Sequence, residues 1–265
     1  MLDLSALEPL LRAALAEDLG PGDVTSEALV PEDAMAEAAI VAKADGVLAG
    51  VDVAAEVLRL AGSEAGVVVA DGDVVAPGGI VLEAKGNARS LLAGERTALN
   101  FLMRMSGIAT LTARFVAAVE GTGASILDTR KTTPGLRVLE KYAVAMGGGE
   151  NHRFGLYDRI LVKENHLAFG GSLDGLQDAV VEAESLEEFR RARDAGAAVV
   201  MLDEFAPEQV AQACAEKGDV EIEVSGGINL DTIRAYADAG ADRISIGALT
   251  HSAPALDLSM RVSPC

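Results

Sequence analysis

The chain has 265 residues, 50% of them apolar, and carries 41 acidic against 22 basic side chains, a formal net charge of -19 at pH 7. This length and apolar content allow one large α/β domain, or a large domain with a smaller companion, and exclude a disordered chain. The negative charge repels nucleic acid and anionic lipid, so it excludes functions that depend on binding either of them.

The number of cysteines and the hydropathy of the chain indicate the cellular compartment of the protein. Only Cys214 and Cys265 are present, and they offer neither metal-ligand nor redox spacing. The N-terminal segment lacks the basic flank of a secretory signal, and no long apolar stretch indicates a membrane span. We therefore expect a cytoplasmic protein with reduced cysteines and with no membrane or nucleic-acid partner.

The first 107 residues predict a small α+β sandwich domain. Alanine-rich strands and one helix are indicated, the strands at 36–44, 67–70 and 80–84 and the helix at 52–60. A long helical region over 89–120 follows, with a break expected near Gly107. We place the domain boundary there, which gives domains 1–107 and 108–265, and expect the C-terminal tail to pack back on the first domain.

The second half alternates short apolar runs with segments of helical period. Strands are indicated at 125–129, 159–163, 179–183, 198–203, 221–225 and 243–247. Ser185 and Glu188 form a capping-box pair that opens a helix, Pro207 suits the first turn of the next helix, and Asn229 suits the cap of a third. The sequence DAGA occurs at 194–197 and again at 238–241, each time between a helix and a strand. Repeated helix-Gly-strand units predict parallel strands with right-handed crossovers.

In a parallel barrel, ligands meet the carboxyl ends of the strands. The residues at these ends are Asp128, Arg130, Lys131, Lys163, Asn165, Glu182, Asp203, Ser225, Gly226, Gly227, Gly247 and Ala248. The two glycine-containing loops follow the last two strands, which is where such barrels commonly bind phosphate.

Basic side chains are concentrated between Asp128 and His166 in this otherwise acidic chain. They are Arg130, Lys131, Arg137, Lys141, His152, Arg153, Arg159 and Lys163. Arginine and lysine bind carboxylate or phosphate through charge-assisted hydrogen bonds, so this cationic stretch predicts a site for one small anion.

The residues alone leave several alternatives open. Asp203 could simply cap a turn, a Gly-Gly pair after a strand could be only a tight turn, and Lys163 with Glu182 could form a buried ion pair. We expect Lys141 and Arg159 to be solvated charges with no role in the site.

A series of motifs in chain order gives a closer interpretation. They are EDLG at 17–20, GDVTS at 22–26, ERTALN at 95–100, DTRKTTPGLR at 128–137, KYAV at 141–144, NHR at 151–153, KENH at 163–166, LD at 202–203, SGGINL at 225–230 and GALTH at 247–251. In these motifs, nearly the whole chain resembles the quinolinate phosphoribosyltransferase family.

The resemblance implies an open, TIM-like parallel α/β barrel joined to an N-terminal α+β sandwich. It implies an enzyme that converts quinolinate and phosphoribosyl pyrophosphate to nicotinate mononucleotide, pyrophosphate and carbon dioxide with Mg²⁺. It also implies a homodimer, or a hexamer of such dimers, in which each active site is completed by the neighbouring subunit.

The resemblance also implies a role for each matching residue. Arg130, His152, Arg153 and Lys163 match the residues that bind the two quinolinate carboxylates, and Arg96 matches an arginine contributed by the partner subunit. Lys131 matches a lysine on the pyrophosphate side. Glu182 and Asp203 match an acidic pair near the ribose hydroxyls and Mg²⁺. The cradle for the 5′-phosphate is matched by Ser225, Gly226 and Gly227 together with Gly247 and Ala248.

Two departures from the family pattern are visible. The chain between His166 and Glu182 is short for the family, so we expect a truncated crossover helix at 173–178, and Glu184 competes with Glu182 as the functional acid. Glu204 stands where asparagine is expected. Two other functions stay in consideration: the related molybdenum-transport-associated family, which uses another acceptor, and a non-catalytic sensor of anionic metabolites.

Overall fold

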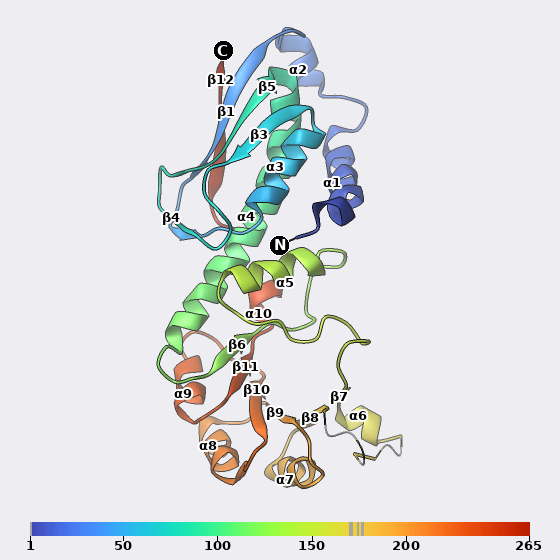
Figure 1. Ribbon diagram of the computed structural model, residues 1–265, viewed down its shortest axis with the longest axis vertical. Helices are drawn as coiled ribbons and strands as arrows, with labels where there is room; N and C mark the ends of the chain where they lie inside the picture. The colour runs from blue at the N-terminus through green and yellow to red at the C-terminus, as the bar shows by residue number, and fades with distance from the viewer. Residues whose placement is uncertain (1, 170–171, 174, 176–177) are drawn as a thin grey trace. The chain divides into compact units, whose positions relative to one another are not determined.

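The computed structural model describes residues 2–169, 172–173, 175 and 178–265. The chain forms two compact units (Figure 1). The first unit contains residues Met1–Leu111, Val138–Gly147 and Ala253–Cys265, and the second contains Thr112–Arg137 and Gly148–Ser252. Each unit is therefore built from segments that are separated in the sequence.

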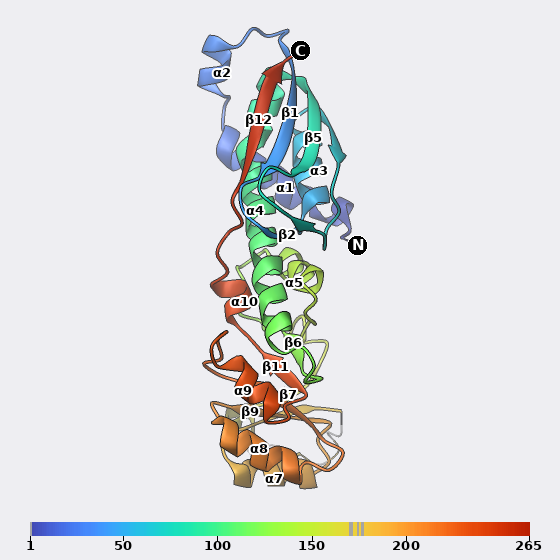
Figure 2. The same ribbon diagram turned by 90° about the vertical axis from the view of Figure 1, so that its left-hand side faces the viewer.

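A four-stranded antiparallel sheet in the order β12-β1-β5-β3 forms the centre of the first unit (Figure 2). Its strands are β1 (Met35–Ala42), β3 (Ser63–Val67), β5 (Ile80–Asn87) and β12 (Leu258–Pro264), and β2 (Gly46–Val47) pairs with β4 (Val74–Val75) beside it. The C-terminal strand thus completes a sheet that begins near the N-terminus. The strand expected at 67–70 lies mainly at 63–67 instead, because β3 takes its register from β5, with Glu64 opposite Lys85.

Five helices accompany this sheet, namely α1 (Leu4–Leu19), α2 (Val24–Leu29), α3 (Val51–Leu60), α4 (Ala88–Ala118) and α5 (Arg137–Met146). Helix α3 packs on β3 and β5 with a buried apolar face that includes Val53, Val57 and Leu58. Asp3 caps α1 by accepting hydrogen bonds from the backbone N–H groups of Ser5 and Ala6.

Helix α4 is continuous, so the expected break near Gly107 is wrong. A Cβ at Gly107 would lie 2.1 Å from the carbonyl oxygen of Pro254. The glycine therefore permits a close approach of the C-terminal segment, and packing keeps the helix intact despite a glycine cost of about 1 kcal/mol.

The second unit is an open α/β barrel of six parallel strands in the order β6-β11-β10-β9-β8-β7 (Figure 1). The strands are β6 (Ser125–Leu127), β7 (Leu161–Val162), β8 (Val180–Ala183), β9 (Val199–Asp203), β10 (Glu221–Ser225) and β11 (Arg243–Ser245). All six expected strands are present, some of them shorter than expected. Glu150 adds an isolated parallel bridge to Leu127 of β6.

The helices of this unit are α6 (Glu164–Leu167), α7 (Leu186–Asp194), α8 (Pro207–Glu216), α9 (Ile233–Asp238) and α10 (Ala248–His251). Ser185 accepts the N–H of Glu188 as expected, whereas the Glu188 carboxylate accepts the N–H of Glu184 rather than that of Ser185. Gly196 and Gly240 both have positive φ, as the repeated DAGA sequence predicts. The helix expected at 173–178 lies partly outside the described residues.

The two faces of the barrel sheet differ in polarity. Ile222 and Val224 of β10 are fully buried on the face that α7 and α8 cover. On the other face, Glu182 and Glu223 lie on either side of Met201 in one row of paired strand residues. This row therefore faces the barrel interior, where buried carboxylates can support a site at the strand ends. No helix among the described residues is long and apolar enough to cross a membrane.

Candidate active site

The strand-end residues gather along the carboxyl edge of the barrel sheet, because all six strands run in the same direction. Asp203 ends β9, and Ser225, its register partner, ends β10. Lys163 directly follows β7, and Gly247 follows β11 by two residues. The sequence prediction that these ends meet at one edge is confirmed.

Arg130 and Arg153 form the cationic part of this edge. The pKa of Arg153 is lowered, first by burial and then by the charge of Arg130, while Asp158 acts in the opposite direction. Neither guanidinium forms an ion pair within the described residues, and the guanidinium of Arg153 donates to the backbone carbonyl of Arg159 at 3.3 Å. Two neighbouring arginines that form no ion pair within the described residues suit an anionic ligand with more than one charge.

Lys163 forms an ion pair with Glu182, and the side chain of Glu182 is 9% exposed. The two residues therefore do form the ion pair that was one of the alternatives, but only Glu182 is nearly buried, whereas Lys163 is half-exposed. Glu184 is exposed, and its pKa is raised, first by the charge of Glu164 and further by Glu188, Glu182 and Asp203. Negative charge therefore accumulates beside Lys163.

The loop after β10 is shaped by two glycines. Gly226 has φ of +99°, and a Cβ there would lie 2.8 Å from the backbone nitrogen of Glu204. Gly227 has φ of +63° and nothing within 4 Å of its Cβ position, so its surroundings are open. A loop with two left-handed glycines and open space can present backbone N–H groups to an anion.

The loop after β11 contacts Lys131, which belongs to the segment after β6. A Cβ on Gly247 would lie 2.8 Å from Cδ of Lys131, so the lysine side chain lies against this glycine. The hydroxyl of Thr250 donates to the backbone carbonyl of Lys131 at 2.7 Å. Lys131 and the second glycine loop are therefore parts of one structure, which agrees with a shared role in binding phosphate groups.

Two buried acids lie beneath this edge: Asp128, which is identified from the sequence only as a strand-end residue, and Glu223, which is not identified from it. The Asp128 carboxylate accepts the backbone N–H of His152 at 2.9 Å and is fully buried. Glu223 is also fully buried, accepts the hydroxyl of Ser245 at 2.5 Å, and lies 3.3 Å from Nε2 of His152. The sequence does contain a signal for Glu223: it stands between the apolar residues Ile222 and Val224 in the strand EIEVS.

Arg137 joins two loops of the site. Its Nε donates to the Thr132 hydroxyl at 3.0 Å, and its Nη1 donates to the carbonyl of Phe154, also at 3.0 Å. These bonds connect the segment after β6 to the segment that carries His152 and Arg153. Arg137, although part of the cationic stretch, therefore has a structural role: it connects these two loops.

Lys141 is 1% exposed, so the expectation of a solvated charge is wrong for it. Helix α5 packs into the first unit, where the neighbouring Glu140 pairs with Arg104 at 2.8 Å. Arg159 is exposed, as expected. Arg96 is an exposed residue of α4 in the first unit.

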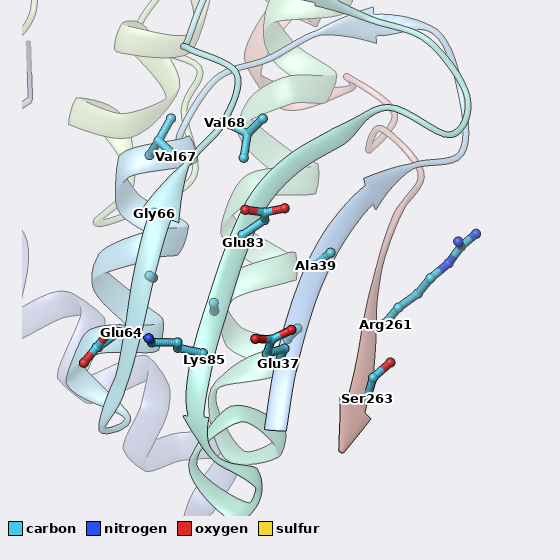
Figure 3. A pocket seen from close by; sticks show the side chains of 13 residues that line it. Glu37, Ala39, Glu64, Gly66, Val67, Val68, Glu83, Lys85, Arg261 and Ser263 are labelled. Atoms are coloured by element: carbon cyan, nitrogen blue, oxygen red, sulfur yellow. Dashed lines mark ion pairs between the residues drawn. The ribbon is translucent and has the colours of Figure 1, made fainter. Parts of the chain in front are cut away.

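The first unit has a hollow that none of these residues lines. It has a volume of about 740 Å³ and lies on the outer face of the four-stranded sheet (Figure 3). Glu37, Glu64 and Glu83 outnumber Lys85 and Arg261 there, so it does not suit a dianion. In the second unit, a hollow of about 380 Å³ is lined by Glu164, Glu182, Glu184, Glu188 and Arg191, among others, and its acidic lining suits a cation better than a phosphate.

Comparisons with known proteins agree with the motifs. The family models for the N-terminal and C-terminal domains of quinolinate phosphoribosyl transferase match residues 23–106 and 108–261. A probable nicotinate-nucleotide pyrophosphorylase (carboxylating) of Bacillus subtilis is 42% identical over 97% of this chain and 93% of its own length. The nicotinate-nucleotide pyrophosphorylase (carboxylating) of Mycobacterium leprae is 41% identical over 97% of this chain and 98% of its own length.

Solved structures show the same relationship. NadC from Streptococcus pyogenes superimposes with a TM-score of 0.93 at 40% identity, over 100% of this chain and 99% of that protein. The nicotinate-nucleotide pyrophosphorylase from Francisella tularensis gives 0.94 at 37% identity, over 99% and 98%. The chain therefore belongs to the quinolinate phosphoribosyl transferase family.

Proposed function

We propose that this chain is a decarboxylating quinolinate phosphoribosyltransferase that makes nicotinate mononucleotide for NAD synthesis. The observation that carries the proposal is the pair Arg130 and Arg153, two neighbouring guanidiniums that form no ion pair within the described residues. They lie along the same strand edge as the two glycine loops. This arrangement suits a dicarboxylate acceptor together with a phosphorylated donor.

Arg130 and Arg153 hold the two quinolinate carboxylates, with His152 and Lys163 as further members of the site. Guanidinium groups bind carboxylates in bidentate fashion, which fixes the plane of the pyridine ring as well as its position. Lys163 already neutralises Glu182 in the protein. A substrate carboxylate therefore competes with Glu182 for the ammonium group.

The phosphoribosyl donor occupies the opposite part of the strand edge. Ser225, Gly226 and Gly227 with Gly247 and Ala248 receive its 5′-phosphate, and Lys131 faces its pyrophosphate. The open surroundings of Gly227 and the contact between Lys131 and Gly247 support this assignment. A fixed lysine can stabilise the charge that develops on a leaving pyrophosphate.

The reaction needs no covalent intermediate with the protein. The pyridine nitrogen attacks the anomeric carbon of the ribose as the bond to pyrophosphate breaks. The adjacent carboxylate then leaves as carbon dioxide, the positive ring nitrogen stabilises the electron pair left on carbon, and a proton completes the product. The bound arginines orient the ring throughout, and Asp203 with Glu182 stabilises positive charge on the ribose.

The acidic residues fit Mg²⁺ that binds together with the donor. Magnesium binds through one or two carboxylates plus substrate phosphates and keeps several waters. Within the described residues no group of three or more metal-ligating side chains is present, but Glu182 and Asp203 lie near the carboxyl ends of the neighbouring strands β8 and β9. Glu182 and Asp203 would hold the ion, which neutralises pyrophosphate charge when bound.

The active site is shared between the subunits of a cytoplasmic homodimer, with Arg96 supplied by the partner subunit. The exposure of Arg96 supports this part of the proposal. A mixture of Arg96→Ala and Lys131→Ala proteins should regain part of the activity that each variant lacks, because the heterodimer has one intact site. Failure of proven heterodimers to regain activity would refute the shared site.

A turnover assay tests the reaction itself. Purified protein with Mg²⁺ and phosphoribosyl pyrophosphate should release carbon dioxide from quinolinate and form nicotinate mononucleotide. Nicotinate serves as the matched acceptor because it lacks one carboxylate. Equal use of nicotinate would overturn the dicarboxylate assignment, and turnover of neither acceptor by folded protein would favour a molybdenum-associated acceptor or a sensor.

A further inference from the structure

Glu223 lies in the barrel interior, one layer below the strand-end residues. It belongs to β10, in register with Met201 of β9, and Ser225 follows two residues later at the edge of the sheet. Its side chain is fully buried. Glu223 thus supports the site from beneath and is separated from its opening by Ser225.

One carboxylate oxygen of Glu223 contacts two neighbouring side chains, those of Ser245 and His152. Oε1 accepts the hydroxyl of Ser245 at 2.5 Å and lies 3.3 Å from Nε2 of His152. Oε2 is buried and has no hydrogen-bond partner within the described residues. A buried carboxylate that is only partly satisfied costs folding free energy, and an apolar residue of similar volume is often as stable or more stable. Stability alone therefore does not account for a carboxylate at this position.

The ring of His152 is oriented from both sides. The backbone N–H of Arg153 donates to Nδ1 at 2.7 Å, so Nδ1 is an acceptor and a neutral ring would carry its proton on Nε2. Nε2 is buried and lies 3.3 Å from Oε1 of Glu223, with no hydrogen bond formed within the described residues. The backbone N–H of His152 donates to Asp128 at 2.9 Å. His152 is 7% exposed. A buried acid therefore lies against the ring of His152, and another accepts its backbone N–H.

We propose that Glu223 is a positioning residue that fixes His152 with its proton on Nε2 and thereby fixes the backbone of Arg153 for dicarboxylate binding. Ser245 holds the Glu223 carboxylate in turn. This assignment rests on the proposed function and deepens it: the orientation of the substrate-binding arginine is set by a chain of contacts from Ser245 of β11 through Glu223 of β10 to His152. A second-layer acid commonly fixes the tautomer of a functional histidine in this way.

Kinetics of Glu223→Ala test the proposal. We expect KM for quinolinate to rise about tenfold or more, and KM for phosphoribosyl pyrophosphate to stay within about twofold, because misplacing one binding group affects only the ligand it holds. Glu223→Gln should restore part of the affinity, since its carbonyl oxygen can still accept the Nε2 proton. Glu221→Gln is the matched control, because Glu221 lies on the same strand and pairs with Arg243 instead.

A double-mutant cycle separates positioning from a general loss of structure. If Glu223 acts through His152, Glu223→Ala should cause little further loss in a His152→Ala background. Additive losses would overturn the proposal, as would an unchanged KM for quinolinate in Glu223→Ala or an equal rise in both KM values.

Imidazole nitrogen NMR gives a readout that needs neither substrate nor turnover. The chain has three histidines, and His166→Ala and His251→Ala identify the remaining signals as those of His152. In the otherwise unchanged protein we expect a protonated Nε2 and an unprotonated Nδ1, and in Glu223→Gln the same tautomer with a shifted Nε2 signal. A proton on Nδ1 would refute the proposal even if the quinolinate reaction is confirmed. The expected tautomer without turnover would place the failure in the proposed function.

Discussion

The side chain of Lys131 lies against Gly247, so that a Cβ on this glycine would be 2.8 Å from Cδ of the lysine. One contact thus joins the loops that follow β6 and β11. It makes the position of the lysine depend on the absence of a side chain at 247.

Gly247→Ala should therefore displace Lys131 and raise KM for phosphoribosyl pyrophosphate about tenfold, with a smaller effect on KM for quinolinate. The backbone of Gly247 is compatible with alanine, because its φ is -65°. Gly66→Ala is the control, since its Cβ would meet nothing within 4 Å. Steady-state kinetics with each substrate varied separately measure the effect, and an unchanged KM for the donor would contradict the contact's role.

Arg153→Lys should raise KM for quinolinate at least tenfold, although the charge is kept, because the planar fork that binds a carboxylate through two hydrogen bonds is lost. Arg159→Lys makes the same chemical change at an exposed residue whose side chain has no assigned role. Equal kinetics of the two variants would show that Arg153 contributes charge alone.

The sequence predicts the barrel well because its signals are local. Each strand of the second unit is a short apolar run, and the glycines at 196 and 240 end helices with positive φ. Parallel strands then bring their carboxyl ends together by topology alone. The positions of Asp203, Ser225 and Gly247 at one edge follow from these local signals.

What the sequence does not reveal depends on contacts between distant segments. Lys141 is buried because α5 joins residues of the first unit that lie far away in the chain. Gly107 stays helical because Pro254 passes close to it. The role of Glu223 likewise depends on His152 and Ser245, which reach it from other strands and loops.

The acidic residues beside Lys163 differ in their expected effect on Mg²⁺. Glu182→Gln and Asp203→Asn should each raise the Mg²⁺ concentration needed for half-maximal activity, whereas Glu184→Gln should not. The exposed Glu184 has a pKa raised by Glu164 and its other acidic neighbours, so it holds its proton more readily than an ordinary glutamate. Magnesium titrations of the three variants at fixed substrate concentrations measure this difference. A large effect of Glu184→Gln alone would show that Glu184, and not Glu182, is the functional acid.

Glu204 is the only residue other than glycine with positive φ, at 59°, in the described part of the chain. Asparagine adopts this conformation more readily than glutamate, so Glu204→Asn should raise the free energy of unfolding by up to about 1 kcal/mol. Glu204→Gln removes the charge and keeps the backbone cost, so it should show little of this gain. Thermal unfolding measures both variants, and equal shifts would attribute the gain to charge.

Glu216 gives a prediction for stability against pH. Its carboxylate accepts two hydrogen bonds from Arg190, at 2.7 and 2.9 Å, and this lowers the pKa of Glu216 from 4.5 to about 2. A lowered folded-state pKa stabilises the protein above the unfolded value, and this stabilisation is lost as pH falls through about 2. Glu216→Gln should therefore lower Tm at pH 7 by an amount that shrinks between pH 5 and about pH 2, as the carboxylate becomes protonated. Glu208→Gln on the same helix controls for a general charge effect, and a Tm difference independent of pH would contradict the assignment.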